Sequence, residues 1–406
     1  MAAIVQFPAI VEELIETFHK VFPDQRTRQH FAEYLTGLMV ARRKNVSAIN
    51  REFAQTTDQS CLNRWITESN WDVSELNRLR LEWLQQDRST RYSKRGVIPI
   101  DNVLIDHTGK HIEDVGYFWD HAESRHKIAH DYLIVNYVCT SGKHYPLEFR
   151  RFVKKDQCQE TGREFKDHNV MFRELVDWVI EQEIPGDFTF DSWFTHADNL
   201  NHIHAAERAY VGDLKTNRKI EFRGRVLKAE QLAGQIPAID RKETEFDGKT
   251  QWYFTKSVRI PKVDHKVRIV ILWKTRDADS PSKVLVSNQT HWDVNRVLKV
   301  YRQRWTGTEC FHRDGKQELG MSDCQLRSGQ GQTRHMYMVF VAYSTLVRQL
   351  DSSRSRGWAQ TRLKTIGEAC MAVTKESLSQ TIRWILDRIE CDCWSLSRVE
   401  QALSLA

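Results

Sequence analysis

The chain has 406 residues, a formal net charge of +6 and 28% charged residues. This length is typical of two or three domains with ample buried core, which excludes a short disordered chain or a small disulfide-held one. No apolar run approaches 18 residues, the N-terminal segment is acidic, and the eight cysteines are scattered. These features predict a cytoplasmic protein with reduced thiols, no signal peptide and no membrane contact.

Residues 1–90 are predicted to form a helical domain, because apolar residues recur there at helical spacing. Ser47 is expected to cap a short helix that ends at Phe53, and Thr57 or Asp58 a second one after a three-residue break. Two short helices with a tight turn are typical of helix-turn-helix units that contact DNA. A plain three-helix packing unit with a basic surface is the alternative.

After a polar linker, residues 97–214 change to short β-like runs mixed with helices. This order of elements predicts a mixed α/β sheet and fits the ribonuclease H-like fold. The expected strands cover residues 97–105, 131–139, 145–153, 188–194 and 209–214, and the expected helices 168–182 and 197–207.

Residues 215–290 are predicted to be an all-β insertion, because alternating and β-branched residues dominate between turn residues. Residues 215–276 hold 16 Lys and Arg against 7 Asp and Glu, a local charge of +9. A basic segment on a near-neutral body indicates binding to a phosphate backbone. Helical periodicity then returns over 291–352, which would complete the core, and over a helical C-terminal region, 353–406.

Three acidic residues, two aspartates followed along the chain by a glutamate, are the candidate catalytic residues. Asp101 lies within an apolar strand, Asp191 at the end of another, and Glu309 on a helix. An acid in an apolar strand is costly unless it is compensated, although backbone amides at a strand end can also compensate it. Together the three carboxylates could hold two divalent metal ions, which cleave phosphodiesters by activating a nucleophile and stabilising the leaving oxygen.

Cations surround Glu309 in the segment from Tyr301 to Lys316, reading YRQRWTGTECFHRDGK. Arg304, Arg313 and Lys316 are expected to contact phosphate, and the Tyr301 hydroxyl can bond a phosphate oxygen. An aromatic side chain can stack on an unpaired base, which would be the role of Trp305. A neutralised surface helix with tryptophan in the core is the alternative.

Tyr301, Arg304, Glu309 and Lys316 resemble the Y-R-E-K signature of bacterial insertion-sequence DDE transposases of the "IS four" and "IS seven-oh-one" type, which carry a β insertion. The resemblance implies that Asp101, Asp191 and Glu309 are catalytic and bind two Mg²⁺ or Mn²⁺ ions. It implies cut-and-paste transposition: cleavage at terminal inverted repeats of double-stranded DNA, then strand transfer into target DNA. It also implies a homodimer on paired ends, near the bacterial nucleoid.

The chain departs from that signature in two places. Four residues separate Arg304 from Glu309 where three are usual, so Gly307 is expected to end one helix, with Glu309 beginning another that Thr306 or Thr308 caps. The first motif lacks a second acid after Asp101, and Asp106 is the reserve candidate. These departures keep two alternative functions open: an inactive, transposase-derived DNA-binding protein, and a structure-specific nuclease on the same fold.

Overall fold

The computed structural model describes residues 4–120 and 123–403. Backbone contacts divide the chain into two compact units. The first unit comprises residues 1–91, 104–130 and 311–406, and the second comprises residues 92–103 and 131–310. Each unit therefore draws on segments that are far apart in the sequence, and each is considered by itself.

The first unit is mainly helical and is organised around α12 (Gly329–Gln349), whose residues are nearly all buried. Helices α2, α4, α5 and α14 pack against it. The other elements of this unit are α1 (Ala9–Thr17), α2 (Gln25–Val40), α3 (Val46–Asn50), α4 (Gln59–Thr67), α5 (Val73–Gln85), β2 (Gly116–Asp120), α13 (Ser353–Trp358), α14 (Ile366–Glu390) and α15 (Leu396–Ala402). A buried hydrogen bond of 2.8 Å joins the Tyr34 hydroxyl of α2 to His335 Nδ1 of α12.

The predicted helix pair near residue 50 differs from expectation in its details. Asn45, not Ser47, caps α3, because its side chain accepts a hydrogen bond from the Ala48 amide. Helix α3 already ends at Asn50, so residues 51–58 separate it from α4 and no three-residue turn forms. Asp58 caps α4 as predicted, accepting a hydrogen bond from the Ser60 amide.

The second unit is built on a mixed sheet, which confirms the predicted α/β class. Its strands follow the order β3-β1-β5-β6-β12-β11-β10-β9, with β4 paired to β3. The β1–β5 and β5–β6 pairs are parallel, whereas β12, β11, β10 and β9 continue from β6 in antiparallel pairs. The strands are β1 (Val97–Asp106), β3 (Arg125–Val138), β4 (His144–Phe152), β5 (Asp187–Phe190), β6 (Tyr210–Asp213), β9 (Lys242–Phe246), β10 (Lys249–Val258), β11 (Val267–Trp273) and β12 (Lys283–Ser287).

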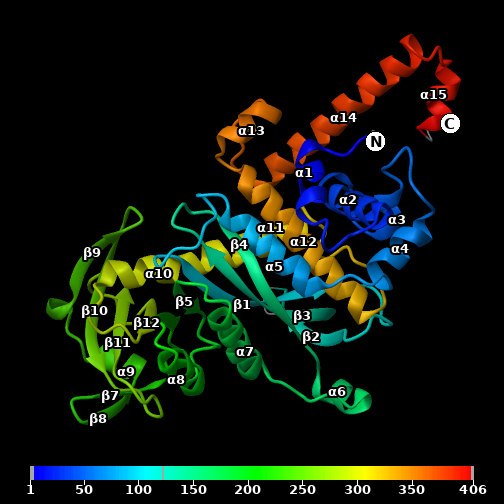
Figure 1. Ribbon diagram of the computed structural model, residues 1–406. Helices are drawn as coiled ribbons and strands as arrows, with labels where there is room; N and C mark the ends of the chain where they lie inside the picture. Colours follow the sequence, from blue (N-terminus) through cyan, green and yellow to red (C-terminus); the bar gives the residue numbers. More distant parts are fainter. Residues whose placement is uncertain (1–3, 121–122, 404–406) are drawn as a thin grey trace. The chain divides into compact units, whose positions relative to one another are not determined.

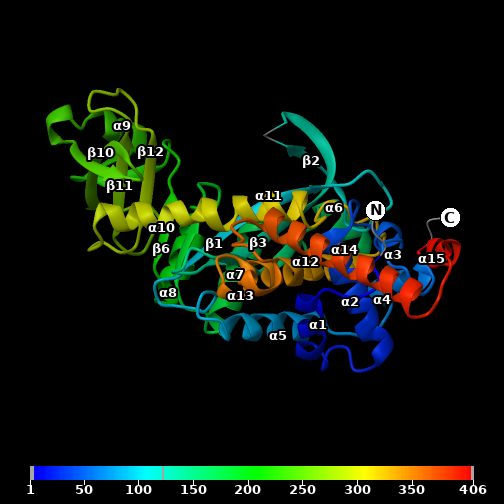
Figure 2. The same ribbon diagram turned by 90° about the horizontal axis from the view of Figure 1, so that it is seen from above.

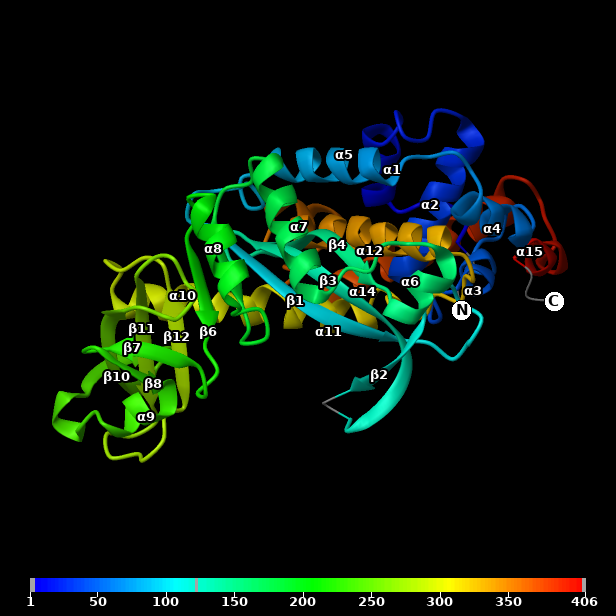
Figure 3. The same ribbon diagram turned by 90° about the horizontal axis from the view of Figure 1, so that it is seen from below.

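Helices cover both faces of this sheet, as the views from above and below show (Figures 2 and 3). Helices α7 (His168–Glu181) and α8 (Ala197–Ala205) lie on one face, where Phe172 of α7 packs edge-on against Phe190 of β5. Helix α10 (Val294–Gly307) lies on the other face, where Arg296 pairs with Asp187 of β5 at 3.5 Å. Alternate residues of β5 thus point to opposite layers, as strand geometry requires.

Residues 215–290 are not all-β as predicted. They form the hairpin of β7 (Lys219–Phe222) and β8 (Arg225–Lys228) and the strands β9 to β12, but also the short helix α9 (Ala229–Gly234) and a 3-10 turn over Ala238–Asp240 (Figure 1). The sequence signal was masked because AEQLAG is too short to show a helical period. Strand β12 pairs with β6, so these strands extend the same sheet.

Candidate active site

Strand register brings Asp101 and Asp191 together. Strands β1 and β5 run parallel, with Pro99 opposite Thr189 and Ile100 opposite Phe190. The next residues in that register are Asp101 and Asp191. Neighbouring strands lie about 4.8 Å apart, so the two aspartates are lateral neighbours. Asp101 emerges on the face that α10 covers, where Arg304 pairs with it. Asp191 directly follows the end of β5, and its negative charge acts on Asp101.

Helix α10 comes unusually close to β1 at Gly307. A Cβ atom on this residue would lie 2.3 Å from Pro99 Cγ and 2.8 Å from Val138 Cγ2. Contacts this short are sterically forbidden, so only glycine allows the helix to lie so near the strands. The close approach lets two residues beside Gly307 reach Asp101: the Arg304 guanidinium forms an ion pair with its carboxylate, and the Thr308 hydroxyl lies 3.4 Å from Oδ2.

A break in the helix absorbs the extra residue between Arg304 and Glu309, which confirms the predicted division into two helices. Helix α10 ends at Gly307, and α11 (Glu309–Gln317) begins two residues later. The Thr308 hydroxyl, expected to cap the second helix, instead donates to the Arg304 carbonyl at 2.9 Å. Glu309 is consequently the first residue of α11, immediately after a residue that contacts Asp101.

The electrostatics of Asp101 indicate that the three carboxylates share one region. Asp101 is only 7% exposed. Burial raises its pKa to about 7, the ion pair with Arg304 opposes that rise, and the nearby negative charges of Asp191 and Glu309 add to it. A buried acid beside two other acids needs a positive partner, and Arg304 supplies it here.

The donor set suits a hard divalent cation, since it consists of carboxylate oxygens without thiolate or imidazole. Among residues 4–120 and 123–403, no three Asp, Glu, His or Cys side chains already lie in a metal-binding arrangement. At Asp101 the carboxylate is paired with the Arg304 guanidinium. Asp101, Asp191 and Glu309 therefore suit a metal ion in their ligand type and in their proximity to one another. In this structure the Arg304 guanidinium balances the charge of Asp101.

The hydroxyl of Tyr301 contacts Asp213 and Lys283. It lies 3.3 Å from Asp213 Oδ2 of β6, and Lys283 Nζ of β12 donates to both groups, at 3.2 Å to the hydroxyl and 3.0 Å to the carboxylate. This half-buried cluster connects α10 to two strands. Trp305, in contrast, is 62% exposed, which contradicts the alternative that it packs in the core.

The other sequence candidates belong to the first unit. Arg313 and Lys316 lie on α11 beyond Glu309, and Arg313 Nε donates to Asp314 at 3.0 Å. The reserve candidate Asp106 pairs with Lys127 at 2.9 Å.

One exposed residue beside the site was missed from the sequence. Trp193 is 58% exposed, and its amide donates to Asp191 Oδ1 at 2.9 Å. Lys215 Nζ lies 5.2 Å from the centre of its ring. An exposed indole with a cation over it offers a stacking surface for a base. The signal was present in the sequence FDSWF, where tryptophan directly follows a polar turn.

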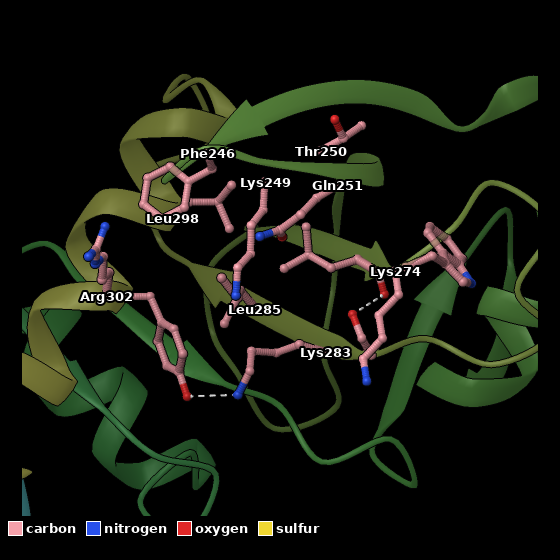
Figure 4. Close-up of a pocket in the computed structure, with 13 residues that line it drawn as sticks. Phe246, Lys249, Thr250, Gln251, Lys274, Lys283, Leu285, Leu298 and Arg302 are labelled. Atoms are coloured by element: carbon pink, nitrogen blue, oxygen red, sulfur yellow. Dashed lines mark hydrogen bonds between the residues drawn. The ribbon is translucent and has the colours of Figure 1, made fainter.

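A pocket of about 670 Å³ lies in the second unit between α10 and the strands β9 to β12 (Figure 4). Its floor is apolar, and four cationic side chains stand around it. These are Lys249, Lys274, Lys283 and Arg302, with Phe246, Trp273 and Tyr301 as the aromatic part of the wall. Helix α10 lines the pocket through Tyr301 and Arg302 and contacts Asp101 through Arg304. One helix therefore borders both the pocket and the candidate catalytic site.

Two models of known families match the chain. Residues 17–252 match the DDE superfamily endonuclease family, and residues 166–345 match the transposase DDE domain. The first match covers more than half of the chain, so the chain belongs to the DDE superfamily endonucleases. This family implies nuclease activity on DNA. The two matches together span Asp101, Asp191 and Glu309. No curated protein matches the chain, and none of its described helices is long and apolar enough to cross a membrane.

Proposed function

We propose that this protein is a cut-and-paste DNA transposase. It would hydrolyse phosphodiesters at the terminal inverted repeats of a mobile element and join the freed ends to target DNA. The observation that carries the proposal is that Asp101, on the interior strand β1, lies near enough to Asp191 and Glu309 for their negative charges to add to the rise in its pKa, to about 7, that burial causes. Clusters of acids that perturb one another are typical of functional sites.

Asp101, Asp191 and Glu309 would hold two Mg²⁺ or Mn²⁺ ions. When bound, such a pair supplies an activated oxygen nucleophile and stabilises the leaving oxygen of an in-line displacement. Asp101 would have to exchange its ion pair with Arg304 for the metal. The released guanidinium would then be free to bind a phosphate oxygen in the bidentate manner that arginine favours.

DNA would be held by residues on both sides of Glu309. Arg304, Arg313, Lys316 and Tyr301 are the proposed phosphate contacts, and exposed Trp305 is the proposed stacking surface. The basic segment 215–290 would clamp the backbone, and its cationic pocket, lined by Lys249 and Lys274 among others, is the strongest candidate contact.

The proposed domain plan follows from this function. Residues 1–90 would bind DNA, residues 97–214 and 291–352 would form a ribonuclease H-like core of the "IS four" and "IS seven-oh-one" type, and residues 215–290 would be its insertion. Residues 353–406 would form a helical C-terminal region. The protein would act in the bacterial cytoplasm, near the nucleoid, as a homodimer on paired ends.

The test is cleavage of duplex DNA that carries the element's ends, with Mg²⁺, Mn²⁺ or EDTA. We expect nicking by the wild type to require metal, and Asp191→Asn and Glu309→Gln to abolish it, because each removes one carboxylate and keeps the side-chain shape. Asp106→Asn is the matched control and should cut normally.

Each alternative function predicts a different result. Equal cutting by Asp191→Asn and the wild type would overturn the site. Binding without cutting under all conditions would favour the inactive DNA-binding protein. Cutting of junctions without any joined product would favour the structure-specific nuclease.

A further inference from the structure

Helix α14 (Ile366–Glu390) carries an apolar stripe that residues 4–120 and 123–403 leave exposed. Five large apolar side chains on it are exposed, by 58%, 46%, 50%, 48% and 39% of their surface: Met371, Leu378, Ile382, Leu386 and Ile389. An isolated exposed apolar residue needs no explanation, but a contiguous patch of them marks an interaction site.

The opposite face of α14 is attached to its own unit. Residues such as Ala369, Val373 and Ser377 are buried there, where the helix packs on α2 and α12. Thr381 is the last buried residue of the helix, and each residue from Ile382 to Glu390 is exposed or half-buried. The C-terminal half of α14 accordingly extends away from α2 (Figure 1). Trp384 makes an edge-on contact with Trp394, which precedes α15, with ring centres 5.8 Å apart.

The spacing along the stripe is that of a helix pairing with a helix. Met371, Leu378, Ile382 and Ile389 follow at intervals of seven, four and seven residues, and half-buried Ile385 divides the last interval into three and four. Exposed Leu386 lies at the margin of this seam. Alternating steps of three and four keep the side chains on one seam, where they fit between side chains of a facing helix. The seam runs over 19 residues, roughly 28 Å at 1.5 Å per residue.

We propose that this seam binds the α14 helix of a second copy of the chain in an antiparallel pair. A repeated apolar seam is self-complementary, as a two-fold interface requires. Lys375 decides the orientation, because it occupies a seam position between Met371 and Leu378. A parallel pair would place Lys375 against its own copy, and like charges repel at such short range. The antiparallel register that covers the whole stripe places Met371 opposite Ile389 of the second copy.

This interface would serve the homodimer of the proposed function, on which its biological meaning rests, but it can be tested without DNA. Analytical ultracentrifugation of the full chain should show a dimer. Ile382→Glu should weaken it roughly 30-fold or more, as expected for a central interface residue. Because Ile382 is half exposed in the single chain, the variant should fold normally, which circular dichroism checks. Ile239→Glu is the matched control, since Ile239 is 79% exposed elsewhere, and it should leave the dimer intact.

Cysteine cross-linking tests the orientation. In a background with Cys391→Ser and Cys393→Ser, a mixture of Met371→Cys and Ile389→Cys chains should form a disulfide dimer, whereas each variant alone should not. A monomeric wild type, or a dimer that Ile382→Glu leaves unchanged, would overturn the interface. Cross-linking of each variant with itself would overturn the antiparallel arrangement. A wild-type protein that forms the dimer but cuts no DNA would instead count against the proposed function and leave the interface standing.

Discussion

For Gly307→Ala, helix propensity and the close packing of α10 on the strands predict opposite changes in stability. Alanine is favoured over glycine inside a helix by about 1 kcal/mol, so propensity alone predicts a more stable protein. The structure predicts the opposite, because the new Cβ would lie 2.3 Å from Pro99 Cγ and 2.8 Å from Val138 Cγ2. Overpacking of this kind costs about 1–3 kcal/mol. We therefore expect Gly307→Ala to lower the free energy of unfolding by about 1 kcal/mol net.

Relief of that clash would shift α10 away from β1 and move Arg304 and Glu309 with it. A displacement of about 1 Å can lower a reaction rate about 100-fold, so cleavage should suffer more than stability. Urea unfolding measures the first effect and the nicking assay the second. Gly357→Ala in α13 is the control, because its Cβ would meet open space, and it should stabilise slightly. If Gly307→Ala stabilises the protein as much as the control does, the close packing of α10 on β1 is wrong.

Three further results are expected. Arg304→Ala should cost about 1–3 kcal/mol, because buried Asp101 loses its partner and takes up a proton instead of staying charged. Adding Asp101→Asn should restore most of that loss, and strictly additive losses in urea unfolding would contradict the pair. Lys249→Gln with Lys274→Gln should flatten the slope of log affinity against log salt by about 1–2 units in a DNA-binding titration, and an unchanged slope would remove the pocket from the DNA path. Burial lowers the pKa of His335 from 6.5 to about 4, so the folded state resists its protonation. Stability should then fall as pH drops through this range, by about 2 kcal/mol at pH 5; His335→Gln should lose less than the wild type between pH 7 and pH 5 in thermal unfolding, and an equal loss would point to another group.

The elements that carry the site could be predicted from the sequence because each has a strong local signal. Residues 97–105 and 145–153 alternate or run apolar over the right length, and the strands β1 and β4 match them within one residue. The helix at 168–182 has an Asp167 cap and a full helical period, and α7 ends one residue earlier than predicted. The break at Gly307 was also predictable, because the spacing between Arg304 and Glu309 had one residue too many.

Other features depend on contacts that no local pattern encodes. The engagement of Tyr301 with Asp213 and Lys283 joins residues up to 88 positions apart. The Arg304–Asp101 ion pair spans a separation of 203 positions. Asn45, rather than the predicted Ser47, caps α3. Both residue types are good N-caps, so only the path of the backbone decides between them.

The parallel register of β1 and β5 has a consequence for how this chain can change. The stretch between Asp101 and Asp191 is a crossover, and residues can be gained or lost in its loops without moving either aspartate. Within β5 the situation is different, because the strand has four residues and successive side chains alternate between faces. One residue inserted there would turn Asp191 toward the layer of α7 and a phenylalanine toward α10. Insertion scanning should therefore find tolerant loops on both sides of β5. Within β5 an insertion of one residue should not be tolerated, because it reverses the faces to which the following side chains point.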